Sequence, residues 1–83
     1  MARILIVEDE PALARALTRG LSAAAHTVDV AADGTAGLQL ALSGRHELML
    51  LDLMLPGLDG LQLCRRLRES GSAMPVQIGR AHV

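Results

Sequence analysis

The sequence predicts an α/β fold in which a doubly wound parallel sheet is covered by helices on both faces. Two apolar runs, residues 4–7 and 48–51, lack polar alternation, which is typical of central strands buried on both sides. The segments between and after these runs carry leucines at helical spacing. Strands that alternate with helices need right-handed crossovers, so the strands should run parallel. At 83 residues, the chain can form one small domain.

The first helix is expected over residues 11–22, because leucines recur there at every fourth position and form one apolar stripe. These leucines are Leu13, Leu17 and Leu21. Pro11 falls in the first turn, where its missing N–H breaks no hydrogen bond. Residues 27–31 are expected to form a short strand, because valines alternate there with polar neighbours. A second helix is expected over residues 35–42, and Gly44 ends it.

After the apolar run at 48–51, residues 55–60 are expected to form a loop. A third helix is expected over residues 61–69, with Leu61, Cys64 and Leu67 facing inward and the arginines facing outward. Pro75 and Val76 then indicate the start of a fourth strand.

The composition excludes several classes of protein. Hydrophobic residues make up 51% of the chain and none is aromatic, so the core must consist of aliphatic side chains and Met. A net charge of -1 creates no field that favours nucleic acid or an anionic membrane. Cys64 is the single cysteine, which excludes an internal disulfide and favours a reducing compartment. No apolar run approaches the ~18 residues of a membrane span, and early acidic residues exclude a signal peptide. We therefore expect a cytoplasmic protein without membrane contact.

Acidic residues follow two of the expected strands. Glu8 and Asp9 come directly after the first strand, and Asp52 comes directly after the third. Functional groups of an open parallel sheet collect at the carboxyl ends of its strands, so these side chains should meet if the two strands are neighbours. A divalent cation would relieve the repulsion among such carboxylates, and oxygen ligands alone favour Mg²⁺. The sequence therefore predicts a Mg²⁺ pocket in which one Asp can act as a nucleophile toward phosphorus.

The alternative is that acids at strand ends are merely solvated or cap helices. Each of Glu8, Asp9 and Asp52 fits that alternative when it is considered singly, whereas their combination at the ends of two buried strands favours the pocket. Glu10 is interpreted differently. It directly precedes Pro11, where a carboxylate stabilises the positive start of a helix. His26 and His46 each stand alone near a loop and are not candidates for metal ligands.

Several segments resemble response-regulator receiver domains. They are the opening ILIVEDE, the stretch VDVAADGTAGLQLA, the segment LMLLDLMLPGLDG and the LQLCRRLRE that follows it. The resemblance covers residues 2–76, and LDLMLPGLDG is its most specific part. It implies the flavodoxin-like receiver fold, here incomplete after the start of the fourth strand. It also implies the branch of the family that carries a winged-helix DNA-binding domain after the receiver.

The resemblance assigns a role to each residue of the pocket. Asp52 would accept a phosphoryl group from the phosphohistidine of a sensor histidine kinase, in a transfer that the receiver itself catalyses without being a free-standing enzyme. Asp9 and Asp52 would bind Mg²⁺, with Glu8 acting directly or through water. The backbone carbonyl of Met54 would be a further ligand. Asp59 would cap the third helix.

The chain also departs from the family pattern. The family's fourth strand ends in a Ser or Thr, which would fall near Arg80, and its fifth strand ends in a Lys, whereas this chain contains no lysine. The fourth helix, fifth strand and fifth helix, through which the parent would dimerise, are missing, as is the output domain that would bind DNA. We expect residues 1–77 to form a partial receiver domain. We expect residues 78–83 to be a non-native tail, because they can be encoded by a string that resembles a sequencing adapter.

Other interpretations remain open. An aspartyl phosphatase also uses an Asp after a buried strand, but it needs a second Asp two residues later, where this chain has Met54. A receiver-like interaction module that never takes phosphate, or a non-functional fragment, is the other alternative. We expect the chain itself to bind Mg²⁺ weakly and not to signal.

Overall fold

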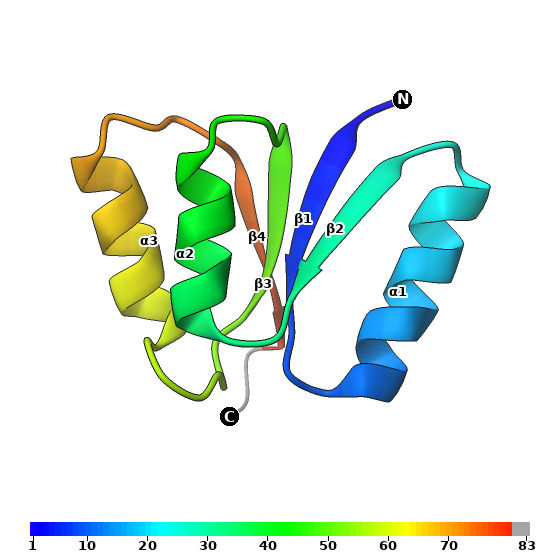
Figure 1. Cartoon of the computed structure of the whole chain (residues 1–83), viewed down its shortest axis with the longest axis horizontal. Coiled ribbons are helices and arrows are strands. Elements are labelled where there is room, and N and C mark those ends of the chain that lie inside the picture. Colours follow the sequence, from blue (N-terminus) through cyan, green and yellow to red (C-terminus); the bar gives the residue numbers. More distant parts are fainter. Residues whose placement is uncertain (81–83) are drawn as a thin grey trace.

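A computed structural model describes residues 1–80 and contains four strands that alternate with three helices (Figure 1). In chain order these are β1 (Arg3–Val7), α1 (Pro11–Ala23), β2 (Thr27–Ala31), α2 (Gly34–Leu42), β3 (Leu48–Asp52), α3 (Gly60–Glu69) and β4 (Val76–Arg80). The strands form one sheet in the order β2-β1-β3-β4, and every pairing is parallel. The predicted fold class is therefore confirmed.

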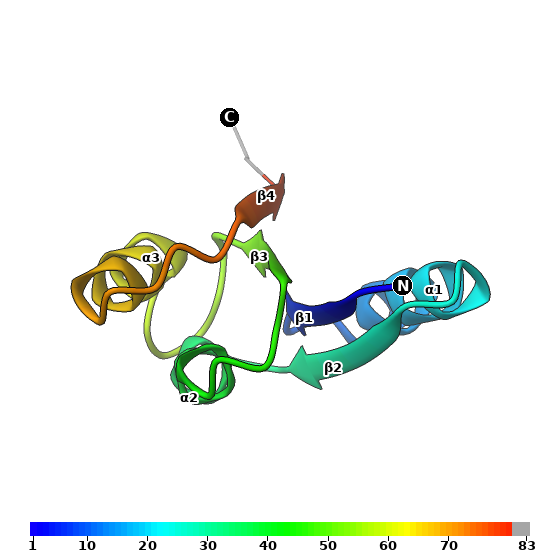
Figure 2. The ribbon, with the colours of Figure 1, turned by 90° about the horizontal axis from the view of Figure 1, so that it is seen from above.

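The helices lie on both faces of the sheet. Helix α1 lies on one face, and α2 and α3 lie on the other (Figure 2). The chain moves from β1 to β2 in one direction across the sheet, and from β2 to β3 and on to β4 in the opposite direction. Because right-handed crossovers are the rule, this reversal places α1 opposite the other two helices. Because β1 and β3 are parallel neighbours, their carboxyl ends open at the same edge of the sheet (Figure 1).

The core lies mainly between the sheet and the helices α2 and α3. Its largest members are at most 1% exposed, and they are Leu5, Val7, Met49, Leu51, Leu63 and Leu67. As predicted, these side chains are all aliphatic or Met. Cys64 is half-buried against this cluster, and burial raises the pKa of its thiol. Its expected role as a small apolar side chain agrees with that position.

One expected inward position is wrong. Leu61 is 64% exposed, whereas Leu63, which was not among the expected inward residues, is fully buried. The helix begins at Gly60, so Leu61 lies in its first turn. The inward stripe is instead formed by Leu63 and Leu67, which are four residues apart, with Cys64 beside them.

Two expectations concern the ends of the fold and the membrane. Residues 78–80 of the expected tail belong to β4, while residues 81–83 lie outside the described part of the chain. The non-native origin of this tail stays a prediction. Within the described residues 1–80, no helix has both the length and the apolar character that are needed to cross a bilayer.

An apolar groove of about 620 Å³ runs along the α1 face of the sheet. Its walls are the leucine stripe of α1 and two half-buried residues of β3, and its apolar lining includes Leu13, Leu17, Leu21, Leu48 and Leu50. Glu8 and Asp52 lie at the wall of the same groove. Strand β4 at the adjacent edge of the sheet has no further strand beside it within residues 1–80.

We expect this chain to self-associate as its concentration rises, because the groove and the edge strands leave apolar surface and backbone groups accessible. Sedimentation velocity over a series of concentrations measures this association. A chain that remains monomeric throughout the series and melts cooperatively would contradict the expectation.

Candidate metal centre

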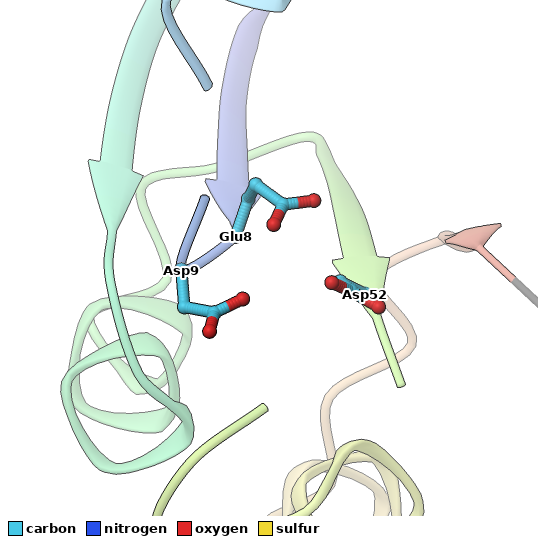
Figure 3. A group of neighbouring side chains, drawn as sticks. All are labelled: Glu8, Asp9 and Asp52. Atoms are coloured by element: carbon cyan, nitrogen blue, oxygen red, sulfur yellow. The ribbon is translucent and has the colours of Figure 1, made fainter. Parts of the chain in front are cut away.

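The acidic side chains that the sequence predicts to meet do lie together at the carboxyl edge of the sheet (Figure 3). Glu8 and Asp9 follow β1, and Asp52 is the last residue of β3. Each offers a carboxylate oxygen, and these oxygens lie within 4.8 Å of one another. The cause is the strand register, which pairs Val7 with Leu51 and so brings the following residue of each strand to the same place.

Two of the three carboxylates are buried. Glu8 is 5% exposed and Asp52 is 3% exposed, whereas Asp9 is exposed. Backbone N–H groups help to hold the buried pair in place. The N–H of Glu10 donates to Glu8 Oε2 at 2.9 Å, and the N–H of Met54 donates to Asp52 Oδ1 at 2.9 Å. The pocket is thus anchored at its buried end and open toward solvent at Asp9.

The donor set of this pocket suits a hard divalent cation. All three side chains supply oxygen, which Mg²⁺ and Ca²⁺ prefer, and none supplies the sulfur or imidazole nitrogen that is typical of zinc sites. A bound cation would also offset the electrostatic cost of holding three carboxylates so close together. The residues present therefore fit the magnesium ion that the sequence predicts.

Two neighbouring acidic residues cap helices and do not belong to the pocket. Glu10 caps α1, because its carboxylate accepts the N–H groups of Ala12 and Leu13. Asp59 caps α3 in the same way by accepting the N–H of Gln62 at 3.0 Å. Both caps were predicted from the sequence. Asp33 caps α2 in addition.

The position expected for a Ser or Thr lies beside the pocket. Strand β4 pairs with β3 so that Arg80 is opposite Asp52, after a register shift between Leu51 and Asp52. The structure therefore brings the end of β4 to the place that the resemblance implies, and this chain has Arg there. Since the chain contains no lysine, no ammonium side chain can contribute to the pocket.

A second polar cluster, which was not predicted from the sequence, lies away from the pocket. The side chain of His46 is fully buried, and its Nε2 lies 2.7 Å from Asp29 Oδ2. Arg3 Nε donates to the same oxygen at 3.1 Å. The hydrogen bond from His46, followed by that from Arg3, lowers the pKa of Asp29 below its ordinary value of 3.8, although burial opposes this shift. His46 lies between α2 and β3, and its partner comes from β2, so it is not isolated.

Comparison with known proteins agrees with the fold. The family model described as the response regulator receiver domain matches residues 4–82. A response regulator named MprA from Mycobacterium ulcerans is 42% identical over 76 residues, which cover 92% of this chain and 33% of that protein. ArlR from Staphylococcus haemolyticus is 50% identical over 72 residues, or 87% of this chain and 33% of that protein. The chain belongs to the response-regulator receiver family.

Solved structures show the same similarity. The receiver domain of the Francisella response regulator 1452 has a TM-score of 0.89 at 27% identity, and the match covers 94% of this chain and 64% of that one. TrrA from Thermotoga maritima, solved in complex with Mg²⁺-BeF, has a TM-score of 0.81 at 32% identity and covers 94% of this chain and 66% of that one. The chain spans about a third of the length of the curated relatives that it matches.

We expect Asp29→Asn to destabilise the fold most at neutral pH. Asn can still accept the hydrogen bonds of His46 and Arg3 but lacks the charge, so a loss of under about 1 kcal/mol is expected for this partly exposed group. A carboxylate whose folded pKa is depressed stabilises the fold above its unfolded pKa, and that contribution is lost as the pH falls through the folded pKa. Urea unfolding at neutral pH and in steps below pH ~4 measures this effect. A difference between the two proteins that stays constant over this range would rule out a charge effect.

Proposed function

We propose that this chain accepts a phosphoryl group on Asp52, with Mg²⁺ bound by Glu8, Asp9, Asp52 and the backbone carbonyl of Met54. The observation that carries this proposal is the meeting of the three carboxylates at the ends of two buried, adjacent strands. Membership of the receiver family supports it. The TrrA structure, described as a complex with Mg²⁺-BeF, supports a role for the same cation.

The buried position of Asp52 suits a nucleophile. One oxygen of its carboxylate forms a bond to phosphorus while the bond between phosphorus and the donor's leaving atom breaks, which yields an acyl phosphate. The N–H of Met54, held against Asp52 Oδ1, fixes the orientation of the carboxylate before the reaction. When bound, Mg²⁺ would neutralise the charge on the phosphoryl oxygens. The exposed side of the pocket at Asp9 provides a path by which a donor can approach.

The phosphoryl donor and the output of the parent protein are inferred from the wider family. We infer that the donor is the phosphohistidine of a sensor histidine kinase. We also infer that the parent protein is a transcriptional regulator that binds DNA through an output domain outside this chain and dimerises through receiver elements that follow β4. The relatives named as response regulators, of which this chain matches about a third, support these inferences. We retain the proposal that residues 1–77 are the receiver portion and residues 78–83 a non-native tail.

We expect incubation with Mg²⁺ and acetyl phosphate to add one phosphoryl group to the chain, and we expect Asp52→Asn to abolish this addition. Intact-mass spectrometry measures the adduct directly. The matched control is Asp59→Asn, which alters an acid in the following loop but keeps a residue that caps helices equally well.

Two outcomes of this experiment would contradict the proposal. An adduct that persists in Asp52→Asn would show that another residue is the acceptor. An unlabelled wild-type chain, beside a longer receiver that is labelled under the same conditions, would identify this sequence as a non-functional fragment.

We expect Asp9→Asn to lower the affinity for Mg²⁺ by at least about tenfold, because it removes a charged ligand from the pocket. The chain has no aromatic residue to report binding by fluorescence, so amide shifts in a ¹⁵N NMR titration with MgCl₂ are the suitable measurement. Glu10→Gln is the control, because the Glu10 carboxylate caps α1 and is not part of the cluster. Equal affinities in the two variants would exclude Asp9 as a ligand.

A further inference from the structure

Helix α2 begins in direct contact with the loop that follows Asp52. The N–H of Gly34 donates to the carbonyl oxygen of Pro56 at 3.4 Å. A methyl group at Gly34 would lie 1.8 Å from the carbonyl oxygen of Leu58 and 2.8 Å from its carbonyl carbon. These are backbone atoms, so they cannot turn aside as the end of a flexible side chain can. The loop can therefore occupy this position only because residue 34 has no side chain.

The same helix meets the other acid-bearing segment one turn later. A methyl group at Gly37 would lie 2.8 Å and 2.9 Å from the two methyl groups of Val7, the residue directly before Glu8. Gly34 and Gly37 are both buried, and residues three apart share one face of a helix. One face of α2 thus rests against both of the segments that carry the carboxylates.

The loop connects this contact to the pocket. Residues 53–59 run from the end of β3 to the start of α3, and Met54 within them donates its N–H to Asp52. The far end of the loop is also closely packed, since a methyl group at Gly60 would lie 2.7 Å from Leu53 Cδ2 and 3.4 Å from the Asp52 carbonyl oxygen. Because this short loop is packed at both ends and against α2 in between, we expect a shift of the loop to displace Met54 as well.

We propose that Gly34 and Gly37 are positioning residues of the acidic pocket, and that their missing side chains set the place of the Asp52 loop and of the end of β1 relative to each other. Neither glycine would touch the cation. They act through Leu58 and Val7, the residues that they contact. This inference rests on the proposed function, because it names the residues that position the same site.

The first test compares Gly34→Ala with Gly20→Ala. Gly20 lies in α1 with nothing within 4 Å of an added methyl group, so its variant controls for the general effect of alanine on a helix. We expect Gly34→Ala to lower the affinity for Mg²⁺ by about tenfold in an NMR titration with MgCl₂, whereas Gly20→Ala leaves it unchanged. We also expect the amide hydrogen of Met54 to exchange faster in Gly34→Ala, while amides of α1 keep their wild-type rates. General destabilisation would instead accelerate exchange throughout the chain.

A second pair of variants decides the matter if Gly34→Ala does not fold. The clash at Gly37 involves side-chain methyl groups, so shortening Val7 can relieve it. We expect Gly37→Ala to weaken Mg²⁺ binding and the double variant Gly37→Ala/Val7→Ala to restore it toward the affinity of Val7→Ala alone.

Each result supports or overturns the inference. Wild-type affinity in a folded Gly34→Ala, or in Gly37→Ala, would overturn it while leaving the proposed function intact. A wild-type chain whose amides do not respond to MgCl₂ would overturn the proposed function, and the positioning role would fall with it. Weakened binding together with exchange that rises only in the loop at 53–59 would support both.

Discussion

The parallel pairing of β1 with β3 determines where each acid of the pocket lies. Because Val7 is paired with Leu51, the next residues, Glu8 and Asp52, emerge at the same point on the edge of the sheet. Apolar neighbours along both strands stabilise this pairing, and burial of each large side chain contributes about 1.5–3 kcal/mol. Buried carboxylates oppose it unless they are partnered. A shift of one residue in either strand would turn its core residues toward the wrong face of the sheet. The register that buries the core residues therefore also brings the acidic residues together.

Much of this arrangement can be predicted from the sequence because it follows from local patterns. The apolar runs, the leucine spacing and the loop residues indicate the strands and helices, and their alternation indicates a parallel sheet. The order of the strands was implied only by the resemblance to receiver domains. The three pocket acids are predictable for the same reason, since each comes directly after a buried run. Glu10 and Asp59 are predictable as caps because capping depends on a few adjacent residues.

The features that were not predicted from the sequence depend on contacts between distant segments. Leu63 faces inward in α3, where it joins the core cluster. The spacing of apolar residues in α3 alone does not decide whether Leu61 or Leu63 faces the core. The partner of His46 is Asp29, on a strand that is seventeen residues away in sequence. The contact between Gly34 and the backbone of Leu58 likewise joins the start of a helix to a loop that only the folded sheet brings beside it. Periodicity identifies an element, but it does not reveal which atoms of another element lie against it.

The three helix caps have a consequence for the charge distribution of the whole molecule. Every helix starts at the edge of the sheet where the pocket lies, so Glu10, Asp33 and Asp59 join Glu8, Asp9 and Asp52 there, which makes six of the nine acidic residues of the chain. Arg66 and Arg68 lie in the last turn of α3, and Arg3 begins β1, at the opposite edge. A net charge of -1 thus conceals an uneven distribution, in which most of the acidic residues lie at one edge of the sheet. Within about 10 Å, the screening length at 0.1 M salt, carboxylates gathered in this way attract cations toward the edge that carries the pocket.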